Sequence, residues 1–197
     1  MLNEKRLLFN NGFGLLRRPD FKRFFMKILM AAVLSVALVL PASLAHAQGY
    51  KNPGGRLAGQ IGLGFAFGPG DSAISMAAEG EYYITDNLSL VPRFTLDMQD
   101  RARLYTFTGD LRLTVALSRL QLFGEGGAGV AIGEADGFRN DTALQIEGGG
   151  GANLFFTDNA AIGTEALVAF PLGFHRYGFY RNDVILQWQI VTIKYIF

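Results

Sequence analysis

From about position 56 to its last residue, the chain repeats one pattern, in which apolar side chains occupy every second position. The pattern is clearest at the end, where Val191, Ile193, Tyr195 and Phe197 alternate with other residues. Such alternation over short runs is typical of antiparallel strands with one apolar face. Eight runs are expected, at 56–67, 73–84, 88–99, 104–116, 120–133, 142–155, 160–173 and 184–197. The sequence therefore predicts an all-β fold of eight strands.

The connections between the runs are of two kinds. Three are tight, at Thr85-Asp86-Asn87, Ser118-Arg119 and Thr157-Asp158-Asn159. Asp and Asn accept hydrogen bonds from their own backbone and tolerate left-handed conformations, so the repeated Thr-Asp-Asn predicts hairpin turns. The other four connections, around 68–72, 100–103, 134–141 and 174–183, are generally longer. Short turns on one side and longer loops on the other predict an up-and-down meander of antiparallel strands.

Side-chain volume indicates which face of the strands points outward. One face is bulky and carries nine aromatic residues, and in the last run it is expected to consist of Ile185, Val191, Ile193, Tyr195 and Phe197. The opposite face is rich in glycine, alanine and charged residues. An eight-stranded barrel has room inside only for modest side chains, so the bulky face must lie outside. Backbone edges cannot stay unpaired in hydrocarbon, so the sequence predicts a closed transmembrane β-barrel.

The inward face is expected to carry ten charged side chains, seven acidic and three basic. They are Glu79, Glu81, Arg93, Asp97, Asp110, Arg112, Glu125, Glu147, Glu165 and Lys194. Buried charges must pair or become neutral, so we interpret them as a network that plugs the lumen. The alternative is a narrow cation-preferring channel, favoured by the excess of carboxylates. A lumen of this size excludes a general porin.

Some residues interrupt the regular pattern. Gln187 and Gln189 break the apolar face of the last run, and we expect them at the outer rim near lipid head groups. Pro92 lies inside the third run, where it removes a ladder hydrogen bond and predicts a β-bulge. Aromatic girdles are expected near the strand ends, with Tyr83 and Phe155 among their members.

Two glycine-rich runs place small residues together on the lipid-facing side, at Gly124, Gly126, Gly148 and Gly150. The favoured interpretation is that these glycines relieve the strong coiling of a small barrel. The alternative is a flat patch that receives a partner or a lipid chain.

The N-terminal segment, residues 1–47, differs from the rest. A basic Lys27, a 13-residue apolar run, Pro41 and Ala45-His46-Ala47 follow Met26, which predicts a signal peptide (core 26–47) cleaved after Ala47. The apolar run is too short for a membrane-spanning helix of about 20 residues. The mature barrel domain is then 48–197, and the sequence leaves open whether translation starts at Met1 or Met26.

Charge and cysteine content exclude several functions. Residues 1–47 hold seven basic and two acidic residues of the chain's 18 and 17, leaving 11 basic and 15 acidic residues. This mildly acidic body argues against a nucleic-acid partner. The chain has no cysteine, which excludes disulfides and thiolate chemistry. We expect no cofactor and no metal site.

The signal peptide, the eight alternating runs, the repeated Thr-Asp-Asn turns and the final "IKYIF" resemble the small outer-membrane β-barrels of Gram-negative bacteria, of the OmpA/OmpX and opacity-protein type. The resemblance covers 48–197 and implies localisation in the outer membrane, among its lipid and lipopolysaccharide. It also implies that Val191, Ile193, Tyr195 and Phe197 form the signal read by the barrel-assembly machinery. A structural, envelope-integrity or surface-interaction role is expected, with no prediction of oligomeric state.

The last long loop carries most of the remaining chemistry. His175 could approach Ser72 and Asp71 of the first loop, which makes a hydrolase geometrically conceivable. The H-x-S arrangement of the lipid A deacylase barrels is missing, so we expect no enzyme. A basic and aromatic cluster could contact lipopolysaccharide through phosphate-binding arginines. Its members are His175, Arg176, Tyr177, Tyr180 and Arg181.

Overall fold

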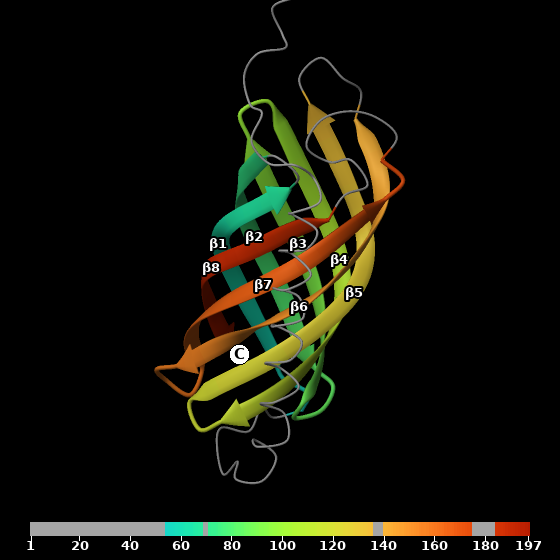
Figure 1. Ribbon diagram of the computed structural model, residues 1–197. Helices are drawn as coiled ribbons and strands as arrows, with labels where there is room; N and C mark the ends of the chain where they lie inside the picture. The colour runs from blue at the N-terminus through green and yellow to red at the C-terminus, as the bar shows by residue number, and fades with distance from the viewer. Residues whose placement is uncertain (1–53, 69–70, 136–139, 175–183) are drawn as a thin grey trace, which may run out of the picture. The chain divides into compact units, whose positions relative to one another are not determined.

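The computed structural model describes residues 54–68, 71–135, 140–174 and 184–197, and these form eight strands (Figure 1). The strands are β1 (Leu57–Gly68), β2 (Asp71–Tyr83), β3 (Leu88–Gln99), β4 (Ala102–Leu117), β5 (Leu120–Ala135), β6 (Asp141–Phe155), β7 (Ala160–Leu172) and β8 (Ile185–Ile196). Every strand predicted from alternation is present, and its ends lie within two residues of the expected positions.

The eight strands close into a barrel. Each strand pairs antiparallel with its sequence neighbour, and β1 pairs with β8. Figure 1 shows the tilted strands wrapping around one axis, with β1 beside β8. Closure pairs the two strands that would otherwise present free backbone groups, which a hydrocarbon environment requires. The predicted up-and-down antiparallel barrel is therefore confirmed.

The exterior is apolar and the interior is polar. Ile61 is 61% exposed and Leu113 is 64% exposed, whereas Arg112 and Lys194 are completely buried. A water-soluble protein shows the reverse distribution, because charged side chains are almost never fully buried without partners. The inverted distribution identifies the outer surface as the lipid-facing one, so the fold is a transmembrane β-barrel. No helix in the described ranges is long and apolar enough to cross a membrane.

A β-bulge lies in β8, at Ile190. Leu63 of β1 pairs with Val191, but the next residue, Gly64, pairs with Gln189, so Ile190 is an extra residue. The register with β7 shifts at the same place, between Gly163 and Glu165. As a result, Ile190 and Val191 both face outward, in consecutive positions.

The bulge predicted at Pro92 is absent. Val91, Pro92 and Arg93 pair in unbroken register with β4, and β3 keeps one register with β2 on both sides of Pro92. The Pro92 ring lies on the exposed outer face. The strand thus tolerates the missing N–H group without an inserted residue, because its partners on both sides hold the register.

Inward-facing glycines let neighbouring strands approach closely. A Cβ atom at Gly129 would overlap the carbonyl oxygen of Phe107, and one at Gly149 would overlap that of Ala166. On the outer face, Gly124 pairs with Gly150 and Gly126 with Gly148. An added Cβ would overlap a carbonyl oxygen at Gly150 but would make ordinary contacts at the other three.

Candidate functional site: the charged lumen

The lumen holds all ten charged side chains that the sequence places on the inward face. They come from β2 to β8, and each is at most 9% exposed. Their convergence follows from strand geometry, because residues two apart on a strand point to the same side. Side chains from seven strands therefore meet inside a barrel too narrow to leave them apart.

Arg93 of β3 lies at the centre of this network. Its Nε donates to Glu79 at 2.9 Å and its Nη1 donates to Asp110 and Glu147, each at 2.9 Å. Its Nη2 donates to Glu165 at 2.7 Å and also to Glu125. A guanidinium has five N–H donors, and here each meets a different carboxylate. Arg93 is thus saturated by partners from five strands, β2 and β4 to β7.

Arg112 of β4 forms a second centre. Its Nε donates to Glu125 at 2.6 Å, and its Nη2 donates to Glu79 at 2.8 Å and to Glu165 at 3.3 Å. Its Nη1 contacts Glu81 at 3.4 Å. The guanidinium also lies 4.2 Å from the ring centroid of Phe123, a cation–π distance. Three glutamates therefore bridge Arg93 and Arg112, which ties the two centres into one network.

Lys194 of β8 extends the network toward the short turns. Its Nζ lies 2.6 Å from Glu81 and donates to Gln121 at 3.1 Å. It also lies 5.4 Å from the ring centroid of Tyr83. Ser89 donates to Glu81 at 2.6 Å. The last strand is thereby connected through side chains to β2, β3 and β5.

Asp97 stands apart from the other six carboxylates. Within the described residues it has no ion-pair partner, and its Oδ2 accepts a hydrogen bond from Gln187 at 2.8 Å. Six carboxylates therefore share three basic groups. Among the described residues, no group of three or more His, Cys, Asp or Glu side chains is arranged to hold a metal ion.

Two clusters of buried apolar residues lie beyond the charged network. The cluster on the long-loop side includes Leu104, Phe174 and Ile185 among several alanines. The cluster on the short-turn side consists of Ala58, Tyr83, Phe155, Ala161 and Ile196. The barrel interior is thus layered, with apolar packing at each end and paired charges between.

Several expected orientations are wrong. Gln187 and Gln189 point into the lumen, where they are almost fully buried, and Ile185 does as well. The bulge at Ile190 reverses the alternation. Positions with the parity of Phe197 face outward after the bulge and inward before it. Tyr83 and Phe155 belong to the short-turn cluster rather than to a girdle. The sequence could have shown this, because Tyr83 lies two residues after the inward Glu81 and Phe155 lies two residues after the inward Asn153.

The expected assembly signal lies on the outer face of β8 and at its end. Val191, Ile193, Tyr195 and Phe197 are all exposed, and the rings of the last two stack edge to face at 5.2 Å. The backbone N–H of Phe197 donates to the carbonyl of Leu57 at 2.9 Å. The C-terminal residue is therefore held against the start of β1.

The expected loop cluster, His175, Arg176, Tyr177, Tyr180 and Arg181, lies outside the described residues, as do the signal peptide and its cleavage site.

Comparison with known proteins relates the chain to others by structure alone. No protein-family model matches it, and no curated protein matches it by sequence. The crystal structure of Neisserial surface protein A (NspA) aligns with a TM-score of 0.58 and 12% identity, over 72% of this chain and 96% of that one.

Two other structures align with a TM-score of 0.50 and 12% identity, each over 73% of this chain. One is the N-terminal β-barrel domain of Pseudomonas aeruginosa OprF, covered over 98% of its length, and the other is Ail, the attachment invasion locus protein of Yersinia pestis, covered over 99%. The chain has the fold of the small eight-stranded outer-membrane β-barrels.

Proposed function

We propose that this chain is an integral outer-membrane protein whose barrel is closed to ions and whose role is structural or lies in surface interaction. The saturated contact set of Arg93 carries the proposal. Five carboxylates from five strands bind one guanidinium, so the side chains that could line a pore are used to join the strands.

The layering of the lumen supports the same conclusion. An ion entering from the long-loop side would first meet the apolar cluster of Leu104, Phe174 and Ile185. It would then have to displace ion pairs whose members are buried. On the short-turn side, the ion would meet the second apolar cluster, which includes Tyr83, Phe155 and Ile196. Hydrophobic constrictions exclude hydrated ions by dewetting, and breaking buried ion pairs is costly.

Conductance in planar bilayers tests the proposal. We expect the refolded mature barrel to give no resolved current steps at neutral pH in simple salt solutions. Single-channel steps with cation selectivity, seen reproducibly with the purified protein and absent with detergent alone, would contradict it.

The narrow cation-preferring channel is the second candidate, and specific observations favour it. Six carboxylates share three basic groups, which leaves an excess of negative charge if all are ionised. Within the described part of the chain, buried oxygens of Asp97, Thr106, Gln145 and Gln187 also have no hydrogen-bond partner. Buried polar oxygens without a protein partner are where water would bind, so a conducting state would run past them.

The external surface provides the other part of the proposal. The apolar outer face suits the outer membrane, and the exposed end of β8 suits recognition of Val191, Ile193, Tyr195 and Phe197 by the barrel-assembly machinery. The last loop suits contact with lipopolysaccharide, since arginine binds phosphate in a bidentate manner. Replacing Arg176 and Arg181 with glutamine should weaken lipopolysaccharide retention without changing heat-modifiable migration on gels.

We further propose that the chain is not an enzyme. If it were an outer-membrane hydrolase, His175 would be the candidate general base, because histidine is the usual one and 48–197 holds no other histidine. Any activity on ester or lipid substrates that His175→Ala abolishes would overturn this proposal.

A further inference from the structure

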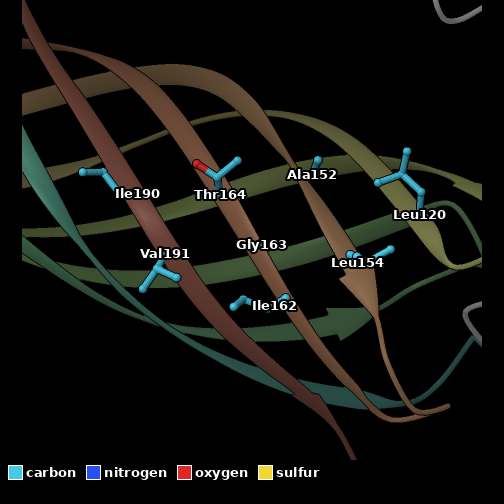
Figure 2. A pocket seen from close by; sticks show the side chains of 8 residues that line it. All are labelled: Leu120, Ala152, Leu154, Ile162, Gly163, Thr164, Ile190 and Val191. Atoms are coloured by element: carbon cyan, nitrogen blue, oxygen red, sulfur yellow. The ribbon is translucent and has the colours of Figure 1, made fainter.

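The outer face of the barrel carries a groove that the lumen network does not explain. It has a volume of about 360 Å³ and is lined from β5 to β8. Its lining residues are Leu120, Ala152, Leu154, Ile162, Gly163, Thr164, Ile190 and Val191. They belong to β5, β6, β7 and β8, and Figure 2 shows how their side chains lie.

The β-bulge builds this groove. Ile190 and Val191 face outward in consecutive positions, which raises a wall along β8. The neighbouring strands provide a low floor, because the outward side chain of Ala152 is only a methyl group and Gly163 lines the groove through its backbone. Leu154 pairs with both Leu120 and Ile162 across the strands and forms the opposite wall. A regular strand at β8 would show one outward side chain here instead of two.

Thr164 gives the groove its one polar side chain. Its Oγ1 donates to the backbone carbonyl of Gln189 at 2.9 Å. Gln189 directly precedes the bulge residue Ile190, so this hydrogen bond gives a partner to a carbonyl beside the bulge. The same oxygen accepts a hydrogen bond from the indole Nε1 of Trp188 at 3.1 Å. The hydroxyl is thus satisfied by the protein, and an apolar occupant leaves no polar group of Thr164 unpaired.

We propose that this groove binds one acyl chain of a glycerophospholipid, with the lipid phosphate at Arg119. The groove is continuous with the lipid-facing surface, so its occupant must be apolar. Its lining residue Leu120 directly follows the exposed Arg119 of a short turn, whose carbonyl accepts from the N–H of Phe155 at 2.8 Å. Short turns of outer-membrane barrels face the periplasm.

The charges on this rim indicate the head group. Arg119 supplies a positive charge for a phosphate, and the next turn carries the exposed Asp158. One positive and one negative charge on neighbouring turns match a zwitterionic head group with a phosphate and an ammonium. Phosphatidylethanolamine has both groups and is the lipid that we use as a probe.

Filling the groove tests the proposal. We would refold the mature barrel in phosphatidylethanolamine-containing detergent micelles and count the retained lipids by native mass spectrometry. The wild-type barrel should keep one lipid. Ala152→Phe should lose it, because the phenyl ring fills the floor. Ala78→Phe, at an outward alanine of β2, is the matched control and should keep it.

A second pair of variants tests the phosphate position. Arg119→Gln should weaken retention, whereas Arg56→Gln, at another exposed arginine beside the start of β1, should not. Heat-modifiable migration reports folding in each case. If Ala152→Phe does not fold, Leu154→Ala removes a groove wall and should lower retention instead.

Trp188 reports on the groove, because it is the only tryptophan in the chain and its indole donates to the lining residue Thr164. Brominated acyl chains quench indole fluorescence on contact. Brominated phosphatidylethanolamine at low mole fraction should quench Trp188 more strongly in Ala78→Phe than in Leu154→Ala. Equal quenching, equal lipid retention by Ala152→Phe and Ala78→Phe, or equal retention by the two arginine variants would each overturn the proposal. So would a dimer on native gels that Ala152→Phe disrupts, because the groove would then bind a second copy.

Discussion

At the scale of single residues, the lumen depends on a few cations that each hold several carboxylates. Arg93 alone satisfies groups on five strands, and three of its partners also bind Arg112. Removing one partner from a buried ion pair leaves an uncompensated charge, which costs more than the pair itself contributes. The network is therefore most sensitive at its centre.

Arg93→Ala should lower the free energy of unfolding by about 3–5 kcal/mol or prevent refolding, the range for loss of one partner from a buried pair. Urea unfolding in detergent micelles, followed by heat-modifiable migration, measures this. Adding Glu165→Gln to Arg93→Ala should recover stability, because it removes one of the stranded charges, whereas Glu165→Gln alone should not stabilise. A loss no greater than that of the exposed Arg56→Ala would contradict the central role of Arg93.

Gly129→Ala should destabilise the barrel by about 1–3 kcal/mol, the usual cost of overpacking. The added Cβ would overlap the carbonyl oxygen of Phe107 and push β4 and β5 apart. Gly109→Ala is the matched control, because an added Cβ there meets no atom within 4 Å. Similar unfolding midpoints for the two variants would show that the strands yield at this contact.

At the scale of strands, the bulge in β8 matters most. Before it, Ile185, Gln187 and Gln189 face the lumen; after it, Thr192, Lys194 and Ile196 do. The bulge also builds the wall of the lipid-facing groove.

Single-cysteine spin labelling from 187 to 193 should reveal the reversal directly. The chain has no native cysteine, so each label is unique. Labels at 190 and 191 should both be accessible to oxygen dissolved in the bilayer, and labels at 189 and 192 should both be shielded. Strict alternation through the whole segment would show that β8 has no bulge.

Most of the fold could be predicted from the sequence, and the rest depended on single residues. Alternation locates each strand, because the outer face of a strand in this barrel must be apolar and the inner face must be small or charged. It also places the lumen charges, since their parity holds within each strand. The bulge at Ile190 was missed although the sequence carries its mark, because the polar positions change parity between Gln189 and Thr192, with two consecutive apolar residues between them. Pro92, by contrast, predicted a bulge that the structure does not contain.

Deleting Phe197 should slow or prevent insertion in cells while leaving a refolded barrel nearly as stable. Phe197 is 71% exposed, its backbone N–H donates to Leu57 and its ring contacts the outward Tyr195, so it contributes little to the packing of the barrel interior. Outer-membrane fractionation measures insertion, and urea unfolding of the refolded protein measures stability. Deleting the N-terminal Gln48 of the mature chain is the control. Normal insertion without Phe197 would contradict the assembly role.

At the scale of the whole molecule, every level of the structure depends on closure between β1 and β8. Closure pairs the last free edge, and it brings Lys194 to Glu81 and Gln189 to Ser75 across the lumen. It also holds the chain end against Leu57. An open sheet would lose these contacts together, so the barrel should unfold as one unit.

A disulfide between the first and last strands tests closure. Ile61 and Ile193 pair directly across the seam and both face outward. Opposed residues in antiparallel strands have Cα atoms about 4.5–5.5 Å apart, within the range of a disulfide. Oxidised Ile61→Cys/Ile193→Cys should therefore form an intramolecular crosslink in micelles, seen as faster migration of the boiled protein that reductant reverses. Ile61→Cys/Leu113→Cys, with its second cysteine on β4, should form none. A crosslink in neither variant, or equally in both, would show that β1 and β8 are not held as neighbours.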